Sequence, residues 1–163
     1  MPVSAWISDE NPGHPAADCI DGDITNHCTN VSPSNVRHPW ITLDLGAAKE
    51  VTSVIIAHRQ PFGKGGTTEY CCTNRILDLD FRVSDDPPAT GNVPFRGGTR
   101  LGFIDKGGKN GGSTTLVAPK ALVGRYVVII NNSKGKYNGN ANFNGIAEIY
   151  VFGSSQPYKC PSK

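Results

Sequence analysis

The sequence predicts an all-β fold, either a sandwich or a barrel. Helical periodicity is nearly absent, whereas short runs rich in β-branched and aromatic residues recur along the chain. Turn-forming residues separate these runs, and the 163 residues include 19 glycines and 12 prolines. Many short strands between turn signals are typical of a packed or closed β structure.

Seven runs are predicted to be strands. The first, WITLDLG, alternates in polarity and places Ile41, Leu43 and Leu45 on one face. The second is largely apolar and β-branched, and the third alternates again. In order along the chain, the seven runs are 40–46, 50–59, 75–85, 101–105, 113–118, 124–131 and 145–153.

Length and charge argue for a single domain and against several classes of function. A chain of 163 residues fits one domain, and neither repeats nor a linker divide it. The formal net charge of +2 is too small and too dispersed to indicate binding to nucleic acid or directly to a membrane surface. No run of about 18 apolar residues occurs that would span a bilayer.

Cysteines and sequons predict an extracellular protein, secreted or part of a cell-surface ectodomain. The chain has five cysteines and two N-glycosylation sequons, at Asn30 and Asn131. Its first residues have neither a basic segment nor an apolar one, so a secreted form would already have lost its signal peptide.

Two long stretches, 10–39 and 131–144, lack strand patterning, and loops of this length are usually functional. The first contains Asp18, Asp21 and Asp23 within six residues, with Gly22 permitting a tight turn. Calcium prefers six to eight oxygen ligands, which such a loop can supply. A solvated acidic turn with Asx-type hydrogen bonds explains the same cluster.

Cys71 and Cys72 are adjacent in the chain. Neighbouring Cα atoms lie about 3.8 Å apart, closer than the roughly 4.4–6.8 Å of ordinary disulfides, and a bond between them closes almost no loop. A disulfide here would therefore be valuable for the stiff, polarisable surface that it presents, against which the apolar face of a sugar ring can pack. The alternative is two reduced, buried thiols that point to opposite sides of a strand.

Several segments together resemble the discoidin domain, also called the coagulation factor V/VIII type C domain. Within that fold the chain is most similar to the fucose-binding F-type lectins, and the rare double cysteine followed by x-x-Arg carries this closer resemblance. The resemblance implies an eight-stranded antiparallel jelly-roll sandwich with long binding loops over 1–153, followed by a C-terminal tail, 154–163. The matching segments are AADCIDGD, HPWITLDLGAAKEVTSVIIAHR, CCTNRI and AEIYVFG.

The resemblance also implies a sugar pocket. It assigns two arginines, Arg59 and Arg75, and a disulfide between Cys71 and Cys72. Two positions depart from the family pattern. Asn30 stands where the family has a histidine, and Tyr70 stands where it has an acidic residue. His58 and His38 are possible substitutes for the missing histidine. Arginine suits this role because its planar fork donates to two sugar oxygens at once.

The family binds calcium through its long first loop. The matching positions are Asp18, Asp21, Asp23, His27, Ala147 and Glu148. Several would act through main-chain carbonyls, with Asp21 and Glu148 supplying carboxylates. At Ala147 the family often has a cysteine bonded to the counterpart of Cys28. That partner is missing here. If Cys71 and Cys72 are bonded to each other, Cys19, Cys28 and Cys160 remain, and any two of them can form a disulfide. The third cysteine is then left as a free thiol.

The predicted function is a non-catalytic lectin domain that binds fucose or a related terminal sugar and is stabilised by calcium. A discoidin-type adhesion module that binds a protein or an anionic lipid headgroup is the alternative. No catalytic triad, metal triad or isolated carboxylate pair stands out, so we expect no enzyme activity. The expected partner is a glycan, with membrane contact only through glycoconjugates, and an oligomer is possible.

Overall fold

The structure is a computed structural model that describes residues 2–30, 38–60, 76, 78–87, 95, 97–105, 111–132 and 146–153. Within these residues the chain forms six strands and one short 3-10 helix. They are β1 (Ser4–Ile7), η1 (Ala16–Cys19), β2 (Trp40–His58), β3 (Leu79–Ser84), β4 (Thr99–Ile104), β5 (Ser113–Asn131) and β6 (Ile146–Phe152). None of the described segments is a helix long and apolar enough to cross a bilayer.

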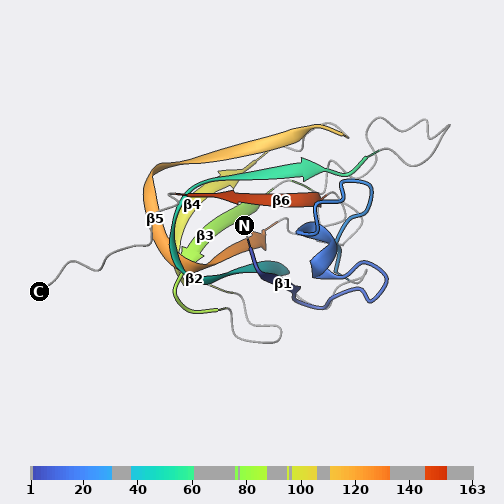
Figure 1. Ribbon diagram of the computed structural model, residues 1–163, viewed down its shortest axis with the longest axis horizontal. Helices are drawn as coiled ribbons and strands as arrows, with labels where there is room; N and C mark the ends of the chain where they lie inside the picture. The colour runs from blue at the N-terminus through green and yellow to red at the C-terminus, as the bar shows by residue number, and fades with distance from the viewer. Residues whose placement is uncertain are drawn as a thin grey trace, which may run out of the picture.

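Two long strands organise the molecule. β2 and β5 have 19 residues each, and Figure 1 shows each of them turning back on itself, so that its two halves lie in different layers. The first half of β2 pairs with β1 and with the end of β5, and the second half pairs with β6 and the start of β5. Register shifts between Asp44 and Lys49 and between Val51 and Ser53 mark the bend.

All strand pairs are antiparallel, in the order β1-β2-β5-β3-β4, and β6 also pairs with β2. Both halves of β2 contribute to one hydrophobic core, through residues such as Leu43 and Ile56. The opposite face of the sheet formed by the first half of β2, the end of β5 and β3 has a second apolar cluster. It consists of Trp40, Tyr126, Val128 and Ile130, with Trp6 and Phe95 packed against it. We call this side the outer face.

The predicted all-β antiparallel class is confirmed. The runs 40–46 and 50–59 form one strand, and so do the runs 113–118 and 124–131. Six strands are therefore described instead of eight. Because the two halves of β2 and of β5 lie in different layers, counting each half separately gives eight segments. The sequence did not predict β1, because its four residues are too short for a pattern. The boundary between the domain and the tail 154–163 stays a prediction, since the tail lies outside the described residues.

A disulfide closes the first long loop. Cys19 and Cys28, nine residues apart, are bonded with their Cα atoms 5.3 Å apart, which selects one of the pairings that the sequence left open. Cys160 lies outside the described residues. Trp40, at the start of β2, is buried, and it belongs to the outer-face cluster and not to the main core.

Candidate binding site

The loop that contains Asp18, Asp21 and Asp23, which we call the acidic loop, contacts β6. The backbone N–H of Gly22 donates to Oε2 of Glu148 at 3.0 Å, and Gly22 has a φ of +86°, a conformation that glycine adopts without strain. Glu148 is only 2% exposed. The structure thus brings Glu148 to the loop of Asp21 and Asp23, which lies more than a hundred residues away in the sequence.

The loop carboxylates also accept hydrogen bonds within the loop. Oδ1 of Asp21 accepts from the Asp23 N–H at 2.8 Å, and its Oδ2 accepts from Nδ2 of Asn26 at 2.8 Å. Oδ1 of Asp23 accepts from the N–H and the hydroxyl of Thr25 at 2.8 and 2.6 Å. These are the Asx-type bonds of an acidic turn, and they hold the loop in a defined conformation.

Negative charge accumulates where the loop meets β6. Burial raises the pKa of Glu148, and the charges of Asp21 and Asp23 raise it further, against the opposing Gly22 hydrogen bond. Burial, followed by the charge of Asp21, also raises the pKa of Asp18. The hydrogen bonds from Thr25 lower the pKa of Asp23. A bound cation would offset the like-charge repulsion that adds to burial in raising the pKa of Glu148 and of Asp18.

The donors around this loop suit a hard cation. They are oxygens, and Oδ1 of Asn26 is buried without a hydrogen-bond partner. Ala147 precedes Glu148 in β6, whereas the His27 ring stacks on His14 with centroids 4.0 Å apart. Over the described ranges, no three His, Cys, Asp or Glu side chains are grouped to hold a metal. A calcium ion would therefore need main-chain carbonyls to complete its ligands.

Two predicted sugar-site residues lie at the end of β2. Arg59 follows the strand and is 7% exposed, so it is not a solvated strand-end residue, and its carbonyl accepts from the Gly111 N–H at 3.1 Å. His58 is buried, and its Nε2 lies 2.8 Å from the Thr114 hydroxyl. The end of β2, the acidic loop and the start of β6 gather at one end of the molecule (Figure 1).

Asn30 is also buried, at 1% exposure, and its backbone forms an isolated bridge with Glu10. Asn131, the acceptor of the other sequon, is 0% exposed. A glycan is bulky and needs a surface site, so neither side chain can carry one in this fold. The sequons therefore do not support the extracellular prediction, whereas the Cys19–Cys28 disulfide agrees with it.

Four predicted sugar-site residues lie outside the described residues: Tyr70, Cys71, Cys72 and Arg75. Whether the cysteines are bonded to each other, and whether Arg75 approaches Arg59, stays a prediction.

The F5/8 type C domain family matches residues 4–149, most of the chain. The chain belongs to this family. The family resemblance predicted from the sequence is thereby confirmed.

Three solved structures illustrate the likeness of this F5/8 type C domain to lectin and carbohydrate-binding folds. A fucolectin from striped bass (Morone saxatilis) serum is 22% identical with a TM-score of 0.69, and the match covers 92% of this chain but only 46% of that one. The lectin domain of lectinolysin, complexed with Lewis B antigen, is 22% identical with a TM-score of 0.63, over 93% of both chains. The family 32 CBM of C. perfringens NanJ, complexed with galactose, is 19% identical with a TM-score of 0.60, over 91% of both.

At these identities the likeness establishes the fold. No curated protein matches the F5/8 type C domain described here.

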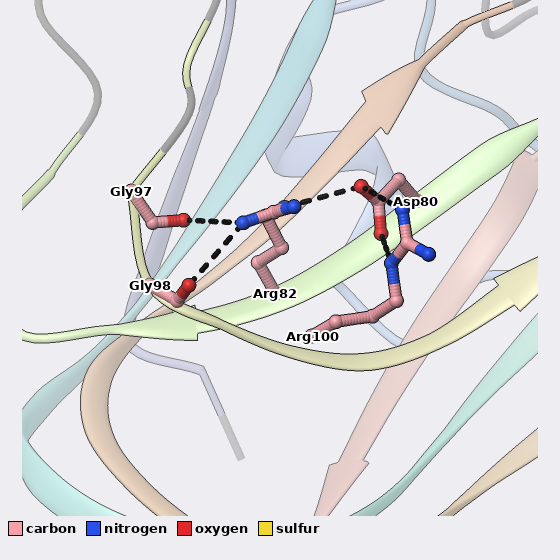
Figure 2. A network of polar contacts seen from close by, with 5 residues as sticks. All are labelled: Asp80, Arg82, Gly97, Gly98 and Arg100. Atoms are coloured by element: carbon pink, nitrogen blue, oxygen red, sulfur yellow. Dashed lines mark hydrogen bonds and ion pairs between the residues drawn. The ribbon is translucent and has the colours of Figure 1, made fainter.

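The outer face of this F5/8 type C domain has a group of charged residues that was not predicted from the sequence. Asp80 accepts hydrogen bonds from Arg82 and from both Nε and Nη2 of Arg100 (Figure 2). They border a cavity of about 450 Å³, which His38 also lines. The alternation within 75–85 could have placed Asp80 and Arg82 on one face, but their meeting with Arg100 depends on strand pairing.

Proposed function

We propose that this F5/8 type C domain is a non-catalytic lectin domain that binds fucose or a related terminal sugar. The observation that carries the proposal is Arg59, a buried arginine at the end of β2, at the position that the resemblance to F-type lectins assigns to a sugar-binding arginine. A guanidinium that is shielded from solvent can be held in one orientation, as a sugar site requires.

The proposed pocket adds residues of different chemistry. Arg75 would supply a second fork for hydroxyl and ring oxygens, and a Cys71–Cys72 disulfide would face the C–H side of the ring. Asn30 and Tyr70 replace the family's histidine and acidic residue, and these replacements change which hydroxyl pattern is preferred. Similar folds are complexed with Lewis B antigen and with galactose, so the terminal sugar could be either a fucose or another hexose.

We propose that calcium stabilises the domain, held by the carboxylates of Glu148 and Asp21 together with main-chain carbonyls of the acidic loop and β6. Burial and the neighbouring charges of Asp21 and Asp23 raise the pKa of Glu148, and a divalent cation there would stabilise its ionised form. The ion would fix the loop and would not touch the sugar. The disulfide and the glycan ligand favour an extracellular location, secreted or on a cell surface.

A glycan array, run with calcium and again with a chelator, tests the proposal. We expect a confined set of hits with a terminal fucose or a related sugar, stronger with calcium. A blank array from folded, oxidised protein would contradict it and would favour the discoidin-type alternative, an adhesion module for a protein or an anionic lipid headgroup.

Substituting Arg59 tests the pocket directly. We expect Arg59→Gln to weaken binding of the best array sugar by about tenfold or more, because a guanidinium fork is lost. Isothermal titration calorimetry measures the affinity. Arg125→Gln is the matched control, since Arg125 is a partly exposed arginine that is paired with Asp44 on another part of the sheet. Equal affinities in both variants, at equal thermal stability, would remove Arg59 from the site.

A further inference from the structure

We propose that the cavity of about 450 Å³ on the outer face is a second binding site, which takes an acidic saccharide residue through its carboxylate. Its volume lies within the roughly 300–1,000 Å³ typical of small-molecule sites. The described residues that line it are His38, Asp80, Arg82, Phe95, Arg100, Ile130 and Asn132. Of the described residues predicted for the sugar site, Asn30, His58 and Arg59 do not line it, whereas His38, one of the two possible substitutes for the missing histidine, does.

Strand pairing builds the cavity. Leu79, Phe81 and Val83 of β3 point into the main core, so Asp80 and Arg82, which alternate with them, face outward. Asp80 pairs in register with Ile130 of β5, and Arg82 pairs with Arg100 of β4 across a register shift. Three strands therefore supply one patch of side chains on the outer face.

The charge of this patch is positive. Oδ1 of Asp80 accepts from Nε of Arg100 at 2.8 Å, and Oδ2 accepts from Nη2 of Arg100 at 3.0 Å and from Nε of Arg82 at 3.1 Å. One buried carboxylate is thus shared by two guanidiniums, so among these three side chains the positive charges outnumber the negative ones by one. Figure 2 shows the three side chains converging. An anion is the ligand that this surplus favours.

Arg100 is the group available to a ligand. Its side chain is 58% exposed, and its pairing with Asp80 uses Nε and one N–H of Nη2. The remaining N–H groups of a guanidinium can bind a second carboxylate in the same plane. Arg82 is directed elsewhere, because its Nη1 donates to the carbonyls of Gly97 and Gly98 at 3.1 and 3.2 Å. Asp80 therefore positions Arg100, and Arg100 contacts the anion.

His38 supplies a second polar contact. It lines the cavity, and its Nδ1 is buried without a hydrogen-bond partner. A buried polar atom without a partner costs stability, and a ligand that provides the missing hydrogen bond recovers that cost. In the Nδ1–H tautomer the ring donates to the same carboxylate as Arg100, or to an adjacent ring hydroxyl.

The apolar side of the cavity favours a sugar over a bare inorganic anion. Phe95 and Ile130 line it together with the charged groups, and the amide of Asn132 adds both donors and acceptors. An aromatic ring beside convergent polar groups suits a pyranose, which has C–H faces and a rim of hydroxyls. Glucuronate combines these features with a carboxylate.

Titration with glucuronate tests the second site, with glucose as the neutral counterpart and acetate as the bare carboxylate. We expect saturable glucuronate binding by calorimetry, with an affinity about tenfold or more above that of either comparison ligand. Backbone amide shifts in NMR should move at Arg100, Ile130 and Asn132. Arg100→Gln should weaken glucuronate binding by about tenfold, because a charge-assisted contact is lost. Arg125→Gln, which removes an equal charge outside the cavity, should leave it within about twofold.

Three results would each overturn the second site. They are equal losses in the two arginine variants, glucose or acetate binding as tightly as glucuronate, or amide shifts confined to residues outside the cavity. The inference is independent of the lectin proposal. Arg100→Gln should not change fucose binding, and a blank glycan array would leave the glucuronate titration unaffected.

Discussion

Glu148 is a buried carboxyl group that links β6 to the acidic loop. It lies in β6, buried, and it accepts a hydrogen bond from Gly22 of a loop close to the other end of the chain. Its carboxyl group is buried against Asp21 and Asp23, which raises its pKa above the usual value of 4.5. A carboxylate that is desolvated beside like charges destabilises the fold when it ionises, unless a cation balances it.

The raised pKa gives a pH dependence with a defined sign. Between pH 4.5 and the folded pKa of Glu148, the folded state binds more protons than the unfolded state, so the free energy of unfolding falls as pH rises through that window. In the presence of chelator, Glu148→Gln should remove this decline while keeping an acceptor for Gly22. Chemical denaturation at a series of pH values measures it.

Asp44→Asn is the control with the opposite sign. The hydrogen bonds from Arg125 lower the pKa of Asp44, so its contribution is present above pH 3.8 and is lost as pH falls through the folded pKa. This variant should change only the acid side of the profile. An unchanged decline in Glu148→Gln would show that another group causes it.

At the scale of elements, the bends of β2 and β5 decide the architecture. Each bend lets one strand take part in both layers, so close packing at the bend is a requirement of the fold. Gly124 lies at the bend of β5, opposite Lys49 of β2. A Cβ built there would lie 2.7 Å from Cγ1 of Val83 and 2.8 Å from the Ser84 carbonyl oxygen, closer than side chains normally approach.

Gly124→Ala is therefore expected to destabilise the protein by about 1–3 kcal/mol, because backbone atoms of β3 must move. Gly102→Ala is the control, since the three atoms nearest to its Cβ would all belong to the Leu116 side chain and the closest, Cδ2, would lie at 3.3 Å. Denaturant unfolding of both variants gives the comparison. Equal stability of the two variants would mean that the bend has room that the structure does not show.

How far the sequence predicts the elements depends on the range of the interactions involved. Alternation found Leu43 and Phe81 on core-facing positions because a strand's face is a local property. It could not join 40–46 to 50–59, since Gly46 and the exposed residues 47–49 interrupt the apolar pattern although the chain stays in one strand. The contact between Glu148 and the acidic loop could be predicted only from the family resemblance. The meeting of Asp80 with Arg100 had no signal at all, because it depends on which strands pair.

At the scale of the whole molecule, the first and the last of the described strands both pair with β2. β1 pairs with the first half of β2, and β6 pairs with its second half. The first loop strengthens this link, because Sγ of Cys19 lies 3.7 Å from the Ile146 carbonyl and Gly22 bonds to Glu148. An ion held between the loop and β6 would therefore stabilise the entire fold and not the loop alone.

The proposed calcium site then predicts a shift of the global unfolding transition. At a calcium concentration about 100 times the Kd, a ligand that binds only the folded state adds about 2.7 kcal/mol to the free energy of unfolding. For a chain of 163 residues this raises Tm by roughly 5–10 °C. Calorimetric scans in calcium and in chelator measure the shift, with magnesium as the control ion because it demands stricter octahedral geometry. Glu148→Gln should abolish most of the shift, because it removes the buried carboxylate that the cation balances. If the scans in calcium and chelator coincide, the acidic turn is held by its own hydrogen bonds and needs no metal.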